Sequence, residues 1–139
     1  MNEAAPLRWE DVAEGMETEL SVCVSDDDMR GFAQLSGDFN PLHTDPAFAR
    51  SKGHGGSVVY GALLLAYVSR LVGMHVPGRD CVLTGLDVTL SNALLVNENA
   101  TLSAVVKQKH DSVRLLEIAF RVATPAKTVA VGVARVLVR

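Results

Sequence analysis

Apolar and polar residues alternate through the second half of the chain, which is the period-two pattern of β-strands. From Cys81 onward, four apolar rows follow one another along the chain, formed by Val82, Leu86, Val88 and Leu90; by Leu102, Ala104 and Val106; by Leu116, Ile118, Phe120 and Val122; and by Val129, Val131 and Val133. The segments 110–112 and 124–127 contain turn-forming residues, and so short a connection joins antiparallel neighbours. The sequence therefore predicts an antiparallel sheet in this half.

The first half has a mixed pattern that predicts one strand and two helices. Residues 16–24 alternate loosely and predict the strand. Ser25 followed by three aspartates is typical of a helix N-terminus, and Gly37 is typical of the position just past a helix C-terminus. Residues 61–73 form the main predicted helix, with apolar side chains nearly all round it. Such a helix must be surrounded by protein.

A long connection, residues 38–56, lies between the two predicted helices and is rich in Gly, Pro, Asp and Asn. Within it, Asp45 and Pro46 have the order of an N-cap followed by proline at the first helical position, which predicts a single helical turn. Residues 51–56 then predict a flexible loop. Because long loops in compact domains are usually functional or disordered, and this one lies between well-formed helices, we expect a function here.

One apolar helix and a following antiparallel sheet have an economical arrangement, in which the sheet curls around the helix. The predicted fold class is therefore α+β, of the single hot-dog kind, with one domain over residues 1–139. In the last strand, small residues alternate with the valines, and we expect them to permit close approach of another backbone, either the helix or a partner subunit: Ala130, Gly132 and Ala134.

Composition and charge narrow the functional classes. Hydrophobic residues make up 48% of the chain and the net charge is −3, so no basic surface for nucleic acid is expected. The N-terminus lacks the pattern of a secretory signal, and the longest apolar stretch, residues 58–72, is interrupted by polar residues. Cys23 and Cys81 are too few for a disulfide framework or a metal knuckle. We expect a soluble cytoplasmic protein with two reduced, buried thiols.

The candidate chemistry lies in the long connection. Asp38 and His43 are five residues apart around the turn formed by Asn40 and Pro41. Such a turn brings a carboxylate and an imidazole together, so that both could reach one water molecule. Imidazole, with a pKa of about 6.5, transfers protons efficiently in both directions near neutral pH. The alternative interpretation is structural: Asp38 then satisfies backbone donors after the helix, and His43 is a polar surface residue.

The run SGDFNPLHTDPAFA at residues 36–49 resembles the hydratase signature of the MaoC-like, (R)-specific enoyl-CoA hydratase family. That family carries D-x-N-P-x-H-x-D after a short helix, on a hot-dog fold. The resemblance extends more weakly through the main helix and into the strands. It implies that Asp38 and His43 are the catalytic pair, which holds one water that adds to C3 while a proton is delivered to C2. Asn40 is implied to support the turn, while for Asp45 we favour a capping role.

The resemblance also implies roles on the main helix. Gly61 aligns with the glycine whose backbone N–H meets the thioester carbonyl, and Ser69 falls where relatives have a serine near the catalytic pair. Ser69 could equally bond a carbonyl one turn back. Relatives have His-Gly where this chain has Tyr60-Gly61, which changes the pocket wall or the surroundings of the catalytic pair. A proline and a Gly-Asp turn of relatives are replaced in residues 93–99, where asparagine can supply the left-handed conformation.

The predicted function is reversible hydration of a trans-2-enoyl thioester to a 3-hydroxyacyl thioester, catalysed by a cofactor-free homodimeric hydro-lyase. The acyl carrier is coenzyme A or an acyl carrier protein. Two alternatives remain: a hot-dog thioesterase, although the main helix has no carboxylate, and a non-catalytic acyl-thioester-binding module. His54, His75 and His110 are not spaced with other ligands as a metal site, and no metal is expected.

Overall fold

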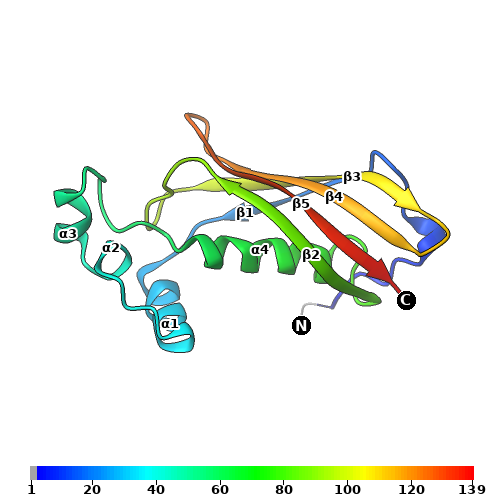
Figure 1. Ribbon diagram of the computed structural model, residues 1–139, viewed down its shortest axis with the longest axis horizontal. Coiled ribbons are helices and arrows are strands. Elements are labelled where there is room, and N and C mark those ends of the chain that lie inside the picture. Colours follow the sequence, from blue (N-terminus) through cyan, green and yellow to red (C-terminus); the bar gives the residue numbers. More distant parts are fainter. Residues whose placement is uncertain (1–2) are drawn as a thin grey trace.

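The computed structural model describes residues 3–139, so residues 1 and 2 of the predicted domain lie outside the described part (Figure 1). Its helices and strands follow one another as η1 (Trp9–Asp11), β1 (Glu17–Val22), α1 (Asp26–Ser36), α2 (Pro41–Thr44), α3 (Pro46–Ser51), α4 (Gly61–Met74), β2 (Cys81–Leu90), β3 (Ala100–His110), β4 (Leu115–Ala123) and β5 (Thr128–Val138). Each predicted element is present, with bounds that differ by a few residues.

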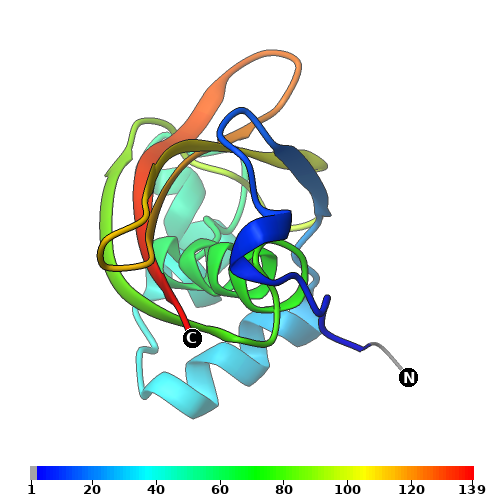
Figure 2. The same ribbon diagram turned by 90° about the vertical axis from the view of Figure 1, so that its right-hand side faces the viewer.

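The five strands form one sheet in the order β1-β3-β4-β5-β2, and every neighbouring pair is antiparallel. Figure 2 shows the sheet curving around α4, while α1 lies on the side of α4 away from the sheet. The predicted α+β arrangement, a sheet wrapped around one central helix, is therefore confirmed. Strands β1 and β2 are its two edges.

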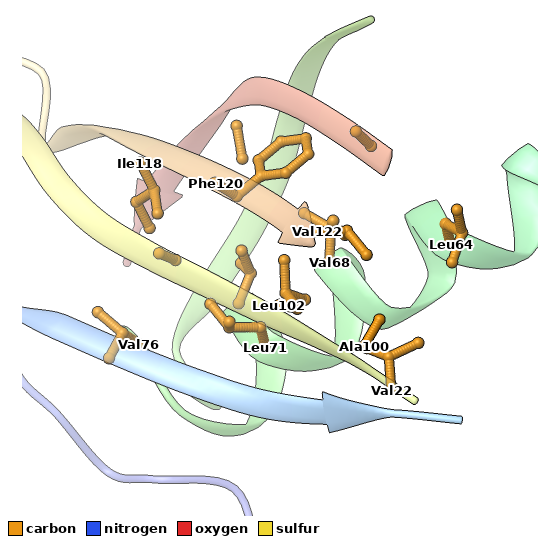
Figure 3. Close-up of a cluster of buried hydrophobic side chains, with 14 of the residues drawn as sticks. Val22, Leu64, Val68, Leu71, Val76, Ala100, Leu102, Ile118, Phe120 and Val122 are labelled. Carbon is orange, nitrogen blue, oxygen red and sulfur yellow. The ribbon is translucent and has the colours of Figure 1, made fainter. Parts of the chain in front are cut away.

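The core lies between the concave face of the sheet and α4. Leu64, Val68 and Leu71 of α4 are almost completely buried, as are Leu102 of β3 and Ile118 of β4. Figure 3 shows these side chains gathered in one cluster. Burying a side chain of this size contributes about 1.5–3 kcal/mol, so the packing of the sheet fixes the position of α4 and of its N-terminus.

Strand β5 presents its small residues to the core. Ala130 and Ala134 are buried, whereas Val131 is 40% exposed on the outer face. At Gly132 an added Cβ would lie 2.6 Å from the Phe120 ring, and it would also collide with the backbone of β2. Gly132 therefore makes room for an aromatic ring of β4 and for the backbone of β2, which is neither the helix nor the partner subunit that we expected.

Strand β2 corrects one row of the predicted sheet. We expected Val82 to share a face with Leu86 and Val88, but Val82 is 48% exposed while the other two pack against the core. The pairing of β2 with β5 shifts by one residue between Leu83 and Gly85. Because side chains alternate between the faces of a strand, this bulge turns Val82 outward.

Local hydrogen bonds set the ends of α1 as predicted. The Ser25 hydroxyl accepts from the Asp28 N–H at 3.1 Å, and the Asp28 carboxylate accepts from the Ser25 N–H at 3.0 Å. This reciprocal pair is a capping box. Gly37 ends the helix in the left-handed conformation, with a φ of 76°. The chain therefore leaves α1 in a fixed direction and enters the connection that carries Asp38.

The turn that replaces the Gly-Asp pattern of relatives is kept by an asparagine. Asn97 has a φ of 67°, and its N–H donates to the Val24 carbonyl at 2.8 Å. This residue supplies the left-handed conformation as expected.

The two cysteines are less buried than we expected, since Cys23 is exposed and Cys81 is only half-buried. Within residues 3–139, no helix combines the length and apolar character needed to cross a bilayer.

Candidate active site

Two short helices, α2 and α3, shape the loop that carries the candidate residues. The Asn40 side-chain oxygen accepts from the Leu42 N–H at 2.9 Å and so caps α2. Asp45 caps α3, accepting from the N–H groups of Ala47 at 3.0 Å and Phe48 at 3.3 Å. Asn40 is thus the N-cap of α2, and Asp45 has the capping position at α3 that we favoured for it. The two caps hold His43 in the last turn of α2.

Asp38 lies at the exposed start of this loop. One of its carboxylate oxygens accepts from the Asn40 N–H at 3.0 Å, and its own N–H donates to the Ser36 hydroxyl at 3.1 Å. Both bonds are local. Only the bond from Asn40 uses a carboxylate oxygen, so the other oxygen remains available to solvent or substrate. Asp38 therefore makes the backbone contact of the structural interpretation, and it also remains accessible for chemistry.

His43 is half-buried and oriented by a strong contact. Its Nδ1 lies 2.6 Å from the carbonyl oxygen of Val58, and that oxygen can only accept, so Nδ1 carries the proton and donates it. Val58 is itself fixed, because its N–H donates to the Leu42 carbonyl at 3.1 Å. Whenever the ring has a single proton, that proton is on Nδ1, and Nε2 has the lone pair that can accept a proton from water or substrate.

His43 and Gly61 border the same cavity, which has a volume of about 280 Å³. The rest of its wall is mainly apolar and comes from the segment before α4, from α4, from β5, and from the end of β2 and the loop that follows it: Val58, Val59, Leu64, Leu90, Ser91, Asn92, Ala93, Leu94 and Val129. His43 also borders a second hollow of about 310 Å³, on the side of α1 and Phe39. Asp38 lines neither cavity.

Gly61 is the first residue of α4 and borders the cavity, and its N–H is unpaired within residues 3–139. The N–H groups of Leu63 and Leu64 donate to the Tyr60 carbonyl at 3.1 and 3.2 Å, whereas the Gly61 N–H has no acceptor within residues 3–139. Free N–H groups and the helix dipole make this end of α4 favourable for negative charge. The start of α4 is therefore electrostatically suited to a negatively charged group.

Of the two placements expected for Tyr60, the structure shows the one in the surroundings of the proposed pair and not the one in the pocket wall. Its side chain is only 2% exposed and does not line the cavity of His43 and Gly61. Its hydroxyl donates to the Asp38 carbonyl at 2.6 Å, and its ring stacks on His43 with centroids 4.1 Å apart. Burial, and secondly the charge of Asp38, raise the pKa of Tyr60 above 10.0. Sequence reasoning missed these contacts, because nothing local to Tyr60 signals them.

Ser69 lies apart from the other candidates. It is exposed on α4, two turns beyond Gly61, and it borders neither cavity of His43. Within the described chain its hydroxyl makes no hydrogen bond, so it is not bonded to a carbonyl one turn back either.

The remaining histidines are separate from this site. His110 ends β3, where its Nε2 lies 3.4 Å from a Glu117 carboxylate oxygen. His75 follows α4 as its C-cap residue, and His54 lies in the loop after α3. Across residues 3–139, no three His, Cys, Asp or Glu side chains come together as a metal site.

The fold and the site define a hot-dog protein in which an imidazole and a helix N-terminus share one apolar cavity. The family model described as "MaoC like domain" matches residues 10–129, and the chain belongs to this family. The resemblance seen in the motif at residues 36–49 is therefore confirmed over most of the chain.

Similar proteins within the family include hydratases and a dehydratase. The (R)-specific enoyl-CoA hydratase of Aeromonas caviae is 30% identical over 117 residues, covering 84% of this chain and 87% of that protein. The 3-hydroxybutyryl-CoA dehydratase of Methylorubrum extorquens is 32% identical over 76 residues, covering 55% and 48%. The solved structure of the (R)-hydratase from A. caviae matches with a TM-score of 0.89 at 27% identity, covering 94% of this chain and 99% of that one.

Proposed function

We propose that this chain is a hydro-lyase that reversibly hydrates a trans-2-enoyl thioester to a 3-hydroxyacyl thioester. One observation carries the proposal: His43 and Gly61, whose N–H has no acceptor within residues 3–139, border the same mainly apolar cavity. An imidazole supplies proton transfer and a helix N-terminus supplies an oxyanion site, which are the two functions that this reaction needs. The relatives named as hydratases and dehydratases support the same class of reaction.

The reaction adds the elements of water across the C2–C3 double bond. The water oxygen bonds to C3 as it loses a proton to the base, and the electrons of the double bond move toward the thioester carbonyl. The negative charge on that oxygen is stabilised by the Gly61 N–H. The resulting enolate then takes a proton at C2, which restores the carbonyl. Water supplies every added atom, so the reaction as proposed uses no cofactor.

Asp38 and His43 are the proposed acid–base pair. His43 Nε2 is the free ring nitrogen, because Nδ1 donates to Val58. The Asp38 carboxylate lies at the start of the same loop and keeps one oxygen's contact with the Asn40 N–H. A water held between the two groups could lose a proton to one while the other protonates C2. Asn40 contributes by capping α2 and so fixing the turn between them.

A second copy of the chain is part of the proposal. Strand β2 is an edge of the sheet and has no partner strand on its outer side within residues 3–139, and exposed edges of this kind are usually covered. Helix α4 presents a row of small residues on one face, of which the first three are exposed and the last is half-buried: Ala62, Ala66, Ser69 and Gly73. A partner subunit packed here would cover both features. Ser69 of one subunit could then lie near the proposed catalytic pair of the other.

The proposal is tested with a panel of short and medium trans-2-enoyl-CoAs and the corresponding acyl carrier protein thioesters. Loss of enoyl absorbance without release of free thiol is the expected result. Release of thiol would instead identify a thioesterase. Binding of the thioesters with neither change would identify an acyl-thioester-binding module. The panel also determines which carrier and which chain length the protein prefers.

A further inference from the structure

Tyr60 connects the two members of the proposed pair. It precedes Gly61 as the N-cap residue of α4, and its ring lies 4.7 Å from the Phe32 ring and 4.1 Å from the His43 ring, measured between centroids. The His43 and Tyr60 planes are within 27° of parallel, so the two rings stack. Tyr60 thus contacts α1, α2 and the loop between them, although it lies outside all three segments.

The hydroxyl of Tyr60 has a partner that matters for chemistry. It donates to the main-chain carbonyl of Asp38 at 2.6 Å, across 22 residues of sequence. The other hydrogen bonds of Asp38 in the described chain reach only Ser36 and Asn40. The Tyr60 hydroxyl is therefore the contact that ties the Asp38 segment to the main helix.

Packing alone does not require this hydroxyl. A phenylalanine would fill the same volume beside Phe32 and His43, and it would bring no buried polar atom that needs a partner. Because burial raises the pKa of Tyr60, the phenol stays protonated and remains a donor at neutral pH. The hydroxyl and the ring thus act on different members of the pair.

We propose that Tyr60 is a positioning residue, which holds the Asp38 backbone through its hydroxyl and the His43 ring through its aromatic face. This inference rests on the proposed function, since it assigns a role relative to the proposed pair. Without the hydroxyl, the Asp38 carboxylate is less often in place for the activated water. The chemical step then slows, while the cavity that binds the acyl chain is unchanged.

The kinetic test compares Tyr60→Phe with Tyr67→Phe, a matched change on the same helix at a residue with no side-chain hydrogen bond in the described chain. Tyr60→Phe should lower kcat roughly two- to tenfold, the effect of one neutral hydrogen bond, and leave KM unchanged. Tyr67→Phe should match the wild type. In an Asp38→Asn background, Tyr60→Phe should have no further effect, because the positioned carboxylate is already absent. Equal factors in both backgrounds, or no loss at all, would overturn the proposal.

A second test needs no turnover. The stacked Tyr60 ring should shift the carbon-bound ring protons of His43 in the NMR spectrum, and His43→Gln identifies these signals among those of the four histidines. Tyr60→Phe should keep the shift, and Tyr60→Leu should remove it. In Tyr60→Phe the amide signals of Asp38 and Asn40 should shift. In Tyr67→Phe the same two signals should stay at their wild-type positions. Unmoved amides in a folded Tyr60→Phe protein would contradict the proposal.

The two tests separate this inference from the proposed function. If the wild type hydrates no enoyl thioester but the NMR changes occur, the proposed reaction is wrong and Tyr60 still positions the loop. If hydration is normal and Tyr60→Phe changes neither kcat nor the amide signals, the reaction stands and the positioning role is wrong.

Discussion

The side chain of Leu90 lies against Gly61 so closely that a Cβ atom at position 61 would stand 2.5 Å from Leu90 Cδ1. Leu90 ends β2 and is 53% exposed, so its side chain has room to move aside. The two residues meet at the wall of the cavity that His43 also borders. Substitutions at position 61 therefore displace Leu90 whether or not they keep the backbone donor.

Gly61→Pro should fold and lose most of its activity. Position 61 is the first residue of α4, where proline is well tolerated, and the Tyr60 ψ of 128° suits a residue before proline. The change deletes the only N–H at this position. Loss of one oxyanion donor costs on the order of a hundredfold or more in kcat, which steady-state kinetics with an enoyl-CoA would measure.

Gly61→Ala is the matched control. It makes the same contact with Leu90 but keeps the N–H, so we expect kcat within about tenfold of the wild type, well short of the loss of an oxyanion donor. Adding Leu90→Ala removes the contact and should restore part of any loss. Equal losses for the alanine and proline variants would show that space beside Leu90, rather than the donor, matters at this position.

Asp38→Asn and His43→Gln should each remove most of the activity and preserve the fold. Asparagine keeps the side-chain oxygen that accepts from the Asn40 N–H, so the turn survives while the charge is lost. Glutamine retains a donor for the Val58 carbonyl but cannot titrate. Each variant should lower kcat by roughly 10²- to 10⁴-fold, the usual contribution of general acid–base catalysis.

The double variant should be little slower than either single one, because the two groups act as one unit. Circular dichroism and sedimentation check that all three proteins fold alike. Hydration at near the wild-type rate by folded Asp38→Asn would make this loop a structural turn and favour the binding module.

Stability should fall at alkaline pH, partly through Tyr60. The folded protein holds the pKa of this phenol above the ordinary value of 10.0, chiefly by burial. The unfolded chain therefore releases the proton first, and stability is lost as the pH rises from about 10 toward the folded pKa. Denaturant midpoints measured from pH 7 to 11 should decline less steeply for Tyr60→Phe. An identical decline in both proteins would assign the loss to other groups.

Sedimentation at micromolar concentration should show a dimer. Ala66→Arg places a long charged side chain in the row of small residues on α4, where the single chain leaves it exposed. The variant should sediment as a folded monomer, because a partner helix can no longer approach closely. Lys107→Ala, a change on an exposed residue of β3, serves as the control and should stay dimeric. A monomeric wild type would contradict the arrangement.

The features that sequence predicted correctly are those whose partners are near in the chain. Ser25, Asn40 and Asp45 each bond a backbone N–H within three residues, so residue type and spacing are enough to recognise them. Gly37 and Asn97 mark left-handed turns for the same local reason. The strand pattern likewise follows from alternation, which the antiparallel sheet confirms.

The features that sequence did not predict depend on distant partners. The Tyr60 hydroxyl reaches Asp38 across 22 residues, and the contact of Leu90 with Gly61 joins the end of a strand to the start of a helix. Val82 faces outward because one residue is inserted in the pairing of β2 and β5, which alternation alone cannot reveal. These features arise only when segments that are distant in the sequence pack or pair with one another.

Because Asn40 and Asp45 cap helices, a match to the motif at residues 36–49 indicates the structure of this loop more directly than it indicates catalytic activity. Two of its polar positions, together with Pro41 and Pro46, are needed to build two short helices whether or not any reaction occurs. A descendant that lost turnover through change at Asp38 or His43 would still require them. Inactive proteins of this fold would therefore match the motif almost as well as active ones. Within the motif, Asp38 and His43 are the two positions that distinguish a conserved loop structure from a conserved catalytic activity.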